Sequence, residues 1–160
     1  MLLTLSFAGL ALFAAQDAEP YFGQGGNLPI DISADGSCEF LDQQDRIKCV
    51  GDVRVTQGIS ILSADEMTVD GVSSDGGFNR IESRGNVRYA DGENAVSGEL
   101  AIYDASTSII TVTGNVIVIQ GEQIMVGGEL IYNTSTGAMS FTPGADGRVR
   151  GLFYTAPSGQ

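Results

Sequence analysis

A threefold internal repeat constrains this sequence more than any other feature. Residues 51–58, 85–92 and 114–121 each begin with Gly, then Asp or Asn, then Val, and each ends with a second Gly seven positions after the first. The copies start 34 and 29 residues apart. Repeats at such spacings indicate supersecondary units that stack on one another. We therefore expect a row of equivalent units with a shared core.

The repeats have the pattern of β-strands. Between residues 30 and 141, apolar and polar residues alternate over short runs that Gly, Asn, Asp and Ser interrupt. This pattern predicts about four short strands per repeat, no helix, and a turn at each Gly-Asp or Gly-Asn pair. The parity of the apolar positions changes near Asp65, Glu99 and Gly128, which predicts a bend or bulge there. One apolar face per repeat must be buried by stacking on its neighbours.

The two ends of the chain differ from the repeats. Residues 1–15 form an apolar run that ends in small residues and is too short to span a bilayer. We interpret residues 1–18 as a secretory signal peptide, with a truncated start explaining its missing basic residues; a buried N-terminal helix is the alternative. Residues 19–29 are expected to be a flexible linker, residues 30–142 one β domain, and residues 143–160 a C-terminal strand and tail.

Composition excludes several function classes. The net charge of −12 argues against a nucleic-acid partner. Without histidine and with only two cysteines, the commonest metal-ligand sets and the usual general base are missing, so we expect no catalytic site, metal or cofactor. The clustered acids Asp65 and Glu66 are interpreted as structural, because no partner base accompanies them.

The two cysteines suggest a crosslink. Cys38 and Cys49 lie symmetrically about a predicted turn at residues 42–45, so a hairpin there would place them opposite one another. A disulfide would suit an exported protein. Two inert buried thiols are the alternative, because pairing does not follow from sequence alone.

Several of these motifs together resemble a known family. The run Ile32-Ser33-Ala34-Asp35, the repeated Gly-Asn-Val motif, and the acidic step before an alternating strand resemble the OstA-like (LptA-type) domain of periplasmic lipopolysaccharide-transport proteins. The resemblance covers residues 30–141. It implies an all-β fold, an antiparallel β-jellyroll that is V-shaped in section, with two facing sheets around an apolar groove for the acyl chains of lipopolysaccharide.

The resemblance also implies partners and a location. Such proteins join end to end and dock with related jellyroll domains of the inner-membrane transport complex and the outer-membrane translocon. The partial repeats at residues 34–40 and 137–141 are the candidate docking edges. The inner-face residues that would line the lipid-binding groove are Phe40, Ile47, Val53, Val55, Leu62, Met67, Val69, Val87, Tyr89, Val96, Tyr103, Val112, Val116, Val118, Met125, Leu130 and Tyr132.

The sequence thus predicts a non-enzymatic periplasmic carrier that passes lipopolysaccharide from the inner to the outer membrane. Two alternatives stay open: a self-assembling β-repeat scaffold with a filled core and no lipid, and a periplasmic domain of another lipopolysaccharide-transport component. A hydrolase that uses Asp65 and Glu66 is a more distant third.

Overall fold

The structure is a computed structural model that describes residues 28–73, 77–92 and 94–154. The predicted signal peptide, nearly all of the predicted linker, and the predicted tail from residue 155 onward lie outside the described residues. No helix in the described part is long and apolar enough to cross a membrane.

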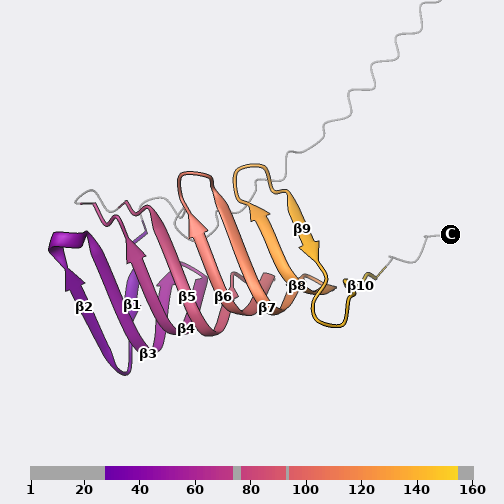
Figure 1. Cartoon of the computed structure of the whole chain (residues 1–160), viewed down its shortest axis with the longest axis horizontal. Helices are drawn as coiled ribbons and strands as arrows, with labels where there is room; N and C mark the ends of the chain where they lie inside the picture. Colours follow the sequence, from indigo (N-terminus) through magenta and orange to yellow (C-terminus); the bar gives the residue numbers. More distant parts are fainter. Residues whose placement is uncertain (1–27, 74–76, 93, 155–160) are drawn as a thin grey trace, which may run out of the picture.

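The described residues form one antiparallel sheet with a single 3-10 turn, η1 (Asp42–Gln44) (Figure 1). Its strands are β1 (Asp31–Ser33), β2 (Ser37–Leu41), β3 (Arg46–Gln57), β4 (Ser60–Asp70), β5 (Arg80–Ala90), β6 (Asn94–Asp104), β7 (Ile109–Gln120), β8 (Gln123–Asn133), β9 (Met139–Thr142) and β10 (Arg150–Leu152). The long strands β3 to β8 pair in sequence order, as successive hairpins do. The all-β antiparallel fold class predicted from the alternation is confirmed.

The repeat unit differs from the sequence expectation in one respect. Each repeat is a hairpin of two long strands, β3–β4, β5–β6 and β7–β8, where the sequence pattern predicted about four short strands. The Gly-Asp and Gly-Asn pairs lie inside β3, β5 and β7 as bends, whereas we expected turns between strands. The same residues suit both roles, because each role needs backbone in the left-handed region.

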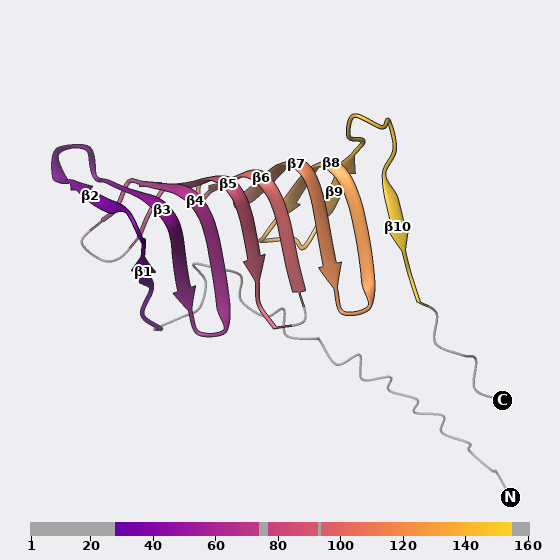
Figure 2. The same cartoon turned by 90° about the horizontal axis from the view of Figure 1, so that it is seen from below.

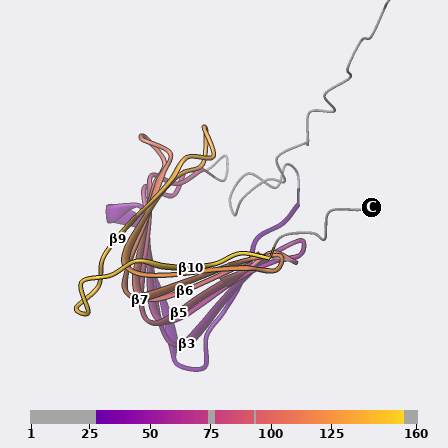
Figure 3. The ribbon, with the colours of Figure 1, turned by 90° about the vertical axis from the view of Figure 1, so that its right-hand side faces the viewer.

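The bends have a common geometry. Gly51, Gly85 and Gly114 have φ of 87°, 74° and 85°, and the Asp or Asn after each has φ of 49°, 47° and 49°. Strand pairing shifts register at each of these bends, and the shifts fall opposite the predicted bulge positions at Asp65, Glu99 and Gly128. A bulge bends its strand, so stacked bends fold the sheet into two arms, the V seen end-on in Figure 3.

Neighbouring repeats are linked at the bends. The Asn86 side chain donates a hydrogen bond to the Asp65 carboxylate at 2.9 Å, and the Asn115 side chain donates one to Glu99 at 3.2 Å. A Cβ atom on Gly85 would lie 2.2 Å from Oδ2 of Asp65, so only glycine fits beside this acid. These contacts give the bend acids a structural role.

Cross-strand register places the inner side chains in continuous rows. On one arm, paired positions join β2 to β9 in the row Phe40, Ile47, Val69, Ile81, Tyr103, Ile110, Tyr132 and Met139. On the other arm, they join β3 to β8 in the row Val55, Leu62, Tyr89, Val96, Val118 and Met125. The shared inner faces predicted from alternation are therefore those of the structure.

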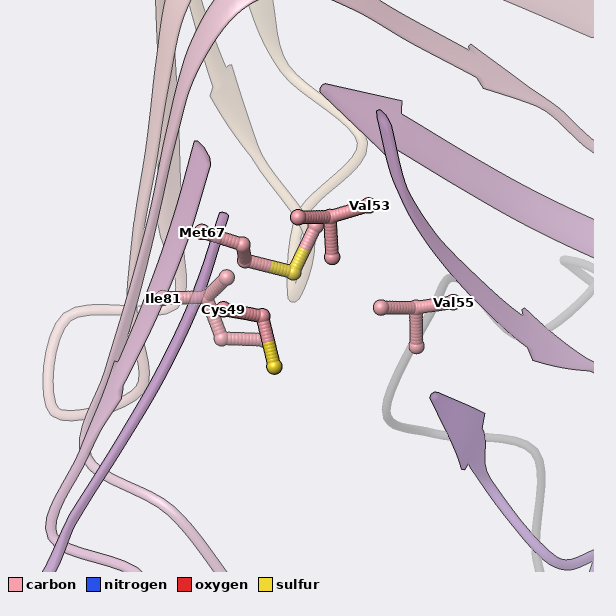
Figure 4. Close-up of a cluster of buried hydrophobic side chains, with 5 residues drawn as sticks. All are labelled: Cys49, Val53, Val55, Met67 and Ile81. Carbon is pink, nitrogen blue, oxygen red and sulfur yellow. The ribbon is translucent and has the colours of Figure 1, made fainter. Parts of the chain in front are cut away.

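Two buried clusters fill the angle between the arms. We call Cys49, Val53, Val55, Met67 and Ile81 the N-terminal cluster. Figure 4 shows their side chains pointing into one interior, with Met67 reaching toward Val53. The C-terminal cluster comprises Val112, Val116, Val118, Leu130 and Tyr132.

Short strands close the two ends of the stack. Strands β1 and β2 both pair with β3, and β9 and β10 both pair with β8, so β1 and β10 lie at opposite ends (Figure 2). Cys38 on β2 lies directly opposite Cys49 on β3, and a disulfide joins them. Strand β10 falls within the further strand expected in the C-terminal segment.

Candidate functional site: an apolar groove between the arms

A groove runs between the two arms from β4 to β9, and members of both clusters form part of its wall. It contains about 980 Å³ of open space, including its solvent-filled mouth. None of the side chains that line it carries a charge. The lining residues are Leu62, Ile81, Ser83, Val87, Tyr89, Asn94, Val96, Ala101, Ile102, Tyr103, Ile110, Val112, Val118, Ile119, Gln120, Leu130, Tyr132 and Met139.

Small residues in the second repeat open the groove. Ser83 and Ala101 lie opposite each other on β5 and β6, in the register row that holds Met67 on β4 and Leu130 on β8. Strand β6 has no buried residue, whereas the other five long strands each have at least two. The groove wall thus includes a small pair within a row of large side chains.

About half of the groove residues predicted from the sequence border this open space. They are Leu62, Val87, Tyr89, Val96, Tyr103, Val112, Val118, Leu130 and Tyr132. Their positions on both arms allow one elongated ligand to touch them together.

The other predicted groove residues lie elsewhere. Ile47, Val53, Val55, Met67 and Val69 belong to the N-terminal cluster or pack against it, where side chains fill the interior. Val116 is buried within the C-terminal cluster, and Met125 packs against that cluster. Phe40 is on the inner row of β2 but is 68% exposed at the end of the stack.

Several lining residues were not among the predicted set. Ile81, Ser83, Ala101, Ile110 and Met139 share the inner parity, so a full list of inner positions would have included them. Asn94 and Gln120 also have inner parity, but as polar residues they were not counted as lining. Ile102 and Ile119 alternate with inner positions, and nothing in the sequence pattern indicates that they border the groove.

The tip of one arm has a polar inner edge. Gln57 and Ser60 are only 8% and 6% exposed. Gln57 Nε2 donates to the carbonyl oxygen of Leu28 at 3.2 Å, and the Tyr89 hydroxyl donates to Asp91 Oδ2 at 2.9 Å and lies 3.4 Å from Ser60 Oγ. The apolar groove thus ends in hydrogen-bonding side chains near its mouth.

The ion-paired side chains of β3, β4 and β5 lie on the outer face. Lys48 pairs with Glu66 at 3.0 Å, and Arg46 pairs with Asp70. Glu82 pairs with Arg84 at 2.5 Å. These residues alternate with the inner rows along β3, β4 and β5. Within the described ranges, no group of His, Cys, Asp and Glu could hold a metal ion.

The bends, the paired arms and the uncharged groove define an antiparallel β-jellyroll that is V-shaped and open along one side. The family model for "LptA/(LptD N-terminal domain) LPS transport protein" matches residues 31–138, and the chain belongs to this family. The family resemblance noted in the sequence is confirmed. LPS transport is the process in which the family takes part.

A solved structure shares the fold. The chain is similar to LptH, described as the LptA homologous periplasmic component of the conserved lipopolysaccharide transport device from Pseudomonas aeruginosa. The TM-score is 0.68 at 21% sequence identity, and the match covers 80% of this chain and 96% of LptH. This likeness confirms the β-jellyroll fold. Among curated proteins, none matches the sequence.

Proposed function

We propose that this protein is a periplasmic carrier that holds the acyl chains of lipopolysaccharide in its groove and passes them from the inner toward the outer membrane. The observation that carries the proposal is the uncharged groove lined from both arms. Each CH₂ group that leaves water contributes about 0.8 kcal/mol, so acyl chains would bind without any specific polar contact. Neither a cofactor nor a catalytic group is needed for this role.

Two observations support a periplasmic location. LptH, which shares the fold, is described as a periplasmic component. The Cys38–Cys49 disulfide suits an oxidising compartment, because thiols in the cytosol are kept reduced. A signal peptide over residues 1–18 would supply the export step.

Both ends of the sheet are suited to docking. Phe40 on β2 is 68% exposed at one end, and Phe153, just after β10, is 57% exposed at the other. Exposed strand edges with apolar side chains can pair with a further strand from another chain. We expect end-to-end self-association here, and docking with related jellyrolls of the inner-membrane complex and the outer-membrane translocon.

Site-specific photocrosslinking to purified lipopolysaccharide tests the carrier role. We would place the probe at Val118 and at Tyr132, which border the groove, and at Arg54, which is exposed, as the control. Adducts from the first two positions but not from Arg54 are expected. A folded protein that gives no adduct from any position, yet still joins end to end, would be a scaffold with no lipid carried.

A second candidate follows from the family description, which names the N-terminal domain of LptD beside LptA. This chain would then act as the periplasmic part of another transport component. Mass spectrometry of the protein isolated from its native cells distinguishes the two roles. A mass that fits residues 19–160 supports a separate carrier, and a much larger one supports the domain.

A further inference from the structure

A row of polar side chains follows the inner edge of one arm at its tip. We call Gln57, Ser60, Asn94, Gln120 and Gln123 the polar rim. Register joins Gln57 to Ser60 and, as a second group, Asn94 to Gln120 and Gln120 to Gln123. Asp91 lies between the two groups: its backbone N–H donates to the Asn94 carbonyl oxygen at 3.0 Å, and its carboxylate accepts from the Tyr89 hydroxyl. Asn94 and Gln120 are two residues beyond Val96 and Val118 along their strands, and therefore on the same side of the sheet.

The rim differs along its length. At the N-terminal end, Gln57 and Ser60 are buried, with their polar atoms near Leu28 and Tyr89. Asn94 and Gln120 border the open groove, and among the described residues neither side chain has a hydrogen-bond partner. Two amides that make no side-chain hydrogen bond within the described residues, Asn94 half-buried and Gln120 exposed, thus lie side by side at the open groove.

The position of this amide pair relates it to the ligand. Residues two apart on a strand are roughly 7 Å apart, so Asn94 lies that far beyond Val96, and Gln120 that far beyond Val118. If acyl chains pack against Val96 and Val118, the atoms that join these chains to the head group would lie beside the two amides. A side-chain amide both donates and accepts, which suits ester and amide carbonyls and sugar hydroxyls.

The absence of charged side chains from the groove lining limits the class of ligand that the groove can recognise. The groove lining includes no Lys or Arg, so it has no ammonium or guanidinium group that could bind a phosphate. A neutral amide pair discriminates by carbonyl and hydroxyl groups. An acylated sugar has both at the junction between its sugar and its acyl chains, whereas a free fatty acid has a single carboxylate.

We propose that Asn94 and Gln120 form a polar subsite that hydrogen-bonds the ester or amide carbonyls and the hydroxyls at the sugar–acyl junction of an acylated sugar, and so sets how deeply its chains enter the groove. This proposal rests on the carrier function proposed above. It assigns to the pair a selectivity that the apolar lining alone does not supply.

The test compares two probes on the full mature chain. Lipid A, an acylated disaccharide, and lauric acid each compete with a fluorescent fatty acid for the groove. In the double variant Asn94→Leu/Gln120→Leu, the Kd for lipid A should rise about tenfold, because two neutral hydrogen bonds are lost. The Kd for lauric acid should change much less, because its single carboxylate only accepts hydrogen bonds and has no hydroxyl to donate one. Gln44→Leu, an exposed amide at the other end of the molecule, should change neither.

The outcomes separate this proposal from the carrier function. Unchanged lipid A affinity with intact lauric acid binding would overturn the amide subsite and leave the carrier role standing. A parallel loss of both ligands would also overturn it, because it would show that the pair only maintains the groove. If the wild-type chain binds neither probe, both proposals fail.

A second double variant keeps the test usable if Asn94→Leu/Gln120→Leu does not fold. Asn94→Thr/Gln120→Thr shortens both side chains and keeps residues that favour strands. It has the same expected effect on lipid A. Exchanging the two amides, in Asn94→Gln/Gln120→Asn, should restore most of the lipid A affinity.

Discussion

The first and second repeats have the same backbone and differ in what fills them. In β3–β4, the inner row has Met67, which packs with Val53 and Val55 into a closed cluster. In β5–β6, the equivalent row has Ser83 and Ala101, and the same space is open groove. The comparison shows how smaller side chains can open a cavity in one repeat. The strand pairing and the bends, which determine the backbone conformation, are alike in both repeats.

The largest expected contrast comes from placing one carboxylate in each repeat. Val53 is 0% exposed, so Val53→Asp buries an unpaired charge and should lower the free energy of unfolding by about 4 kcal/mol or more. Ala101→Asp faces the solvent-filled groove, where the carboxylate keeps its water, and should cost about 1 kcal/mol. Urea denaturation of both variants measures the difference. Equal losses would show that the second repeat is packed as tightly as the first.

The two ends of the stack provide the next contrast. The disulfide joins β2 to β3 across a sequence separation of 11, whereas β9 and β8 are held without a crosslink. In the chain-entropy account, Cys38→Ser should lower the free energy of unfolding by about 2 to 3 kcal/mol.

Hydrogen exchange shows where that loss occurs. Amides of β2 should exchange faster in Cys38→Ser, and those of β9 should keep their wild-type rates as an internal control. Core amides that exchange through global unfolding should speed up with the loss of stability. Faster exchange in β9 by the same factor as in β2 would contradict a local role for the crosslink at the β2 end.

A larger side chain in the groove of the second repeat should close that space, as Met67 does in the first repeat. Ala101→Met places in β6 the residue that β4 has at the same register position. We expect a change in the free energy of unfolding of about 1 kcal/mol or less, since open space accepts the side chain. Photocrosslinking of lipopolysaccharide from Val118 should fall several-fold. An undiminished yield would place the acyl chains elsewhere in the groove.

Much of this architecture could be predicted from the sequence. Alternation predicts which side chains share a face, and it places Tyr103 and Tyr132 on the inner side, as the strand register does. The parity change near Asp65 predicted the bulge. These features depend on residues close together in the sequence, so the sequence pattern is enough to predict them.

Other features depend on contacts between strands. A Gly-Asn pair suits a hairpin turn and a bend within a strand equally well, and only the pairing register distinguishes the two. Val116 and Val118 share a parity, yet only Val118 borders the groove. Val116 is buried within the C-terminal cluster, and that burial depends on contacts with other strands. The position of Asn94 opposite Gln120 likewise depends on register.

The smallest expected effect is on the pH dependence of stability, and it comes from the turn after β6, which resembles the turn after β8. The Oδ1 atom of Asp104 accepts hydrogen bonds from the Ser106 hydroxyl at 2.6 Å and from the Ser106 and Thr107 backbone N–H groups, and Oδ1 of Asn133 accepts equivalent backbone N–H groups after β8. The Ser106 hydroxyl, with the two backbone N–H groups and Arg80, outweighs the opposing effect of burial and holds the pKa of the Asp104 carboxyl below its usual value.

A carboxyl whose pKa is lowered by folding stabilises the native state above its unfolded pKa, and this contribution is lost as the pH falls through its folded pKa. Titration of the Asp104 carboxyl by NMR should therefore give a midpoint below that of an unfolded aspartate. Asp104→Asn should copy the turn at Asn133 and remove this part of the acid sensitivity. A midpoint at the ordinary value would show that the turn does not favour the charged carboxylate.

The bend inside each repeat has a consequence for how such proteins change in length during evolution. Because a Gly-Asp or Gly-Asn pair with left-handed backbone lies within every unit, a duplicated hairpin brings its own bend and extends both arms in line. Each added hairpin would lengthen the groove by roughly 10 Å, two strand spacings, without altering its cross-section. Gene duplication can thus adjust the reach of the molecule in fixed steps while the chemistry of the groove stays the same.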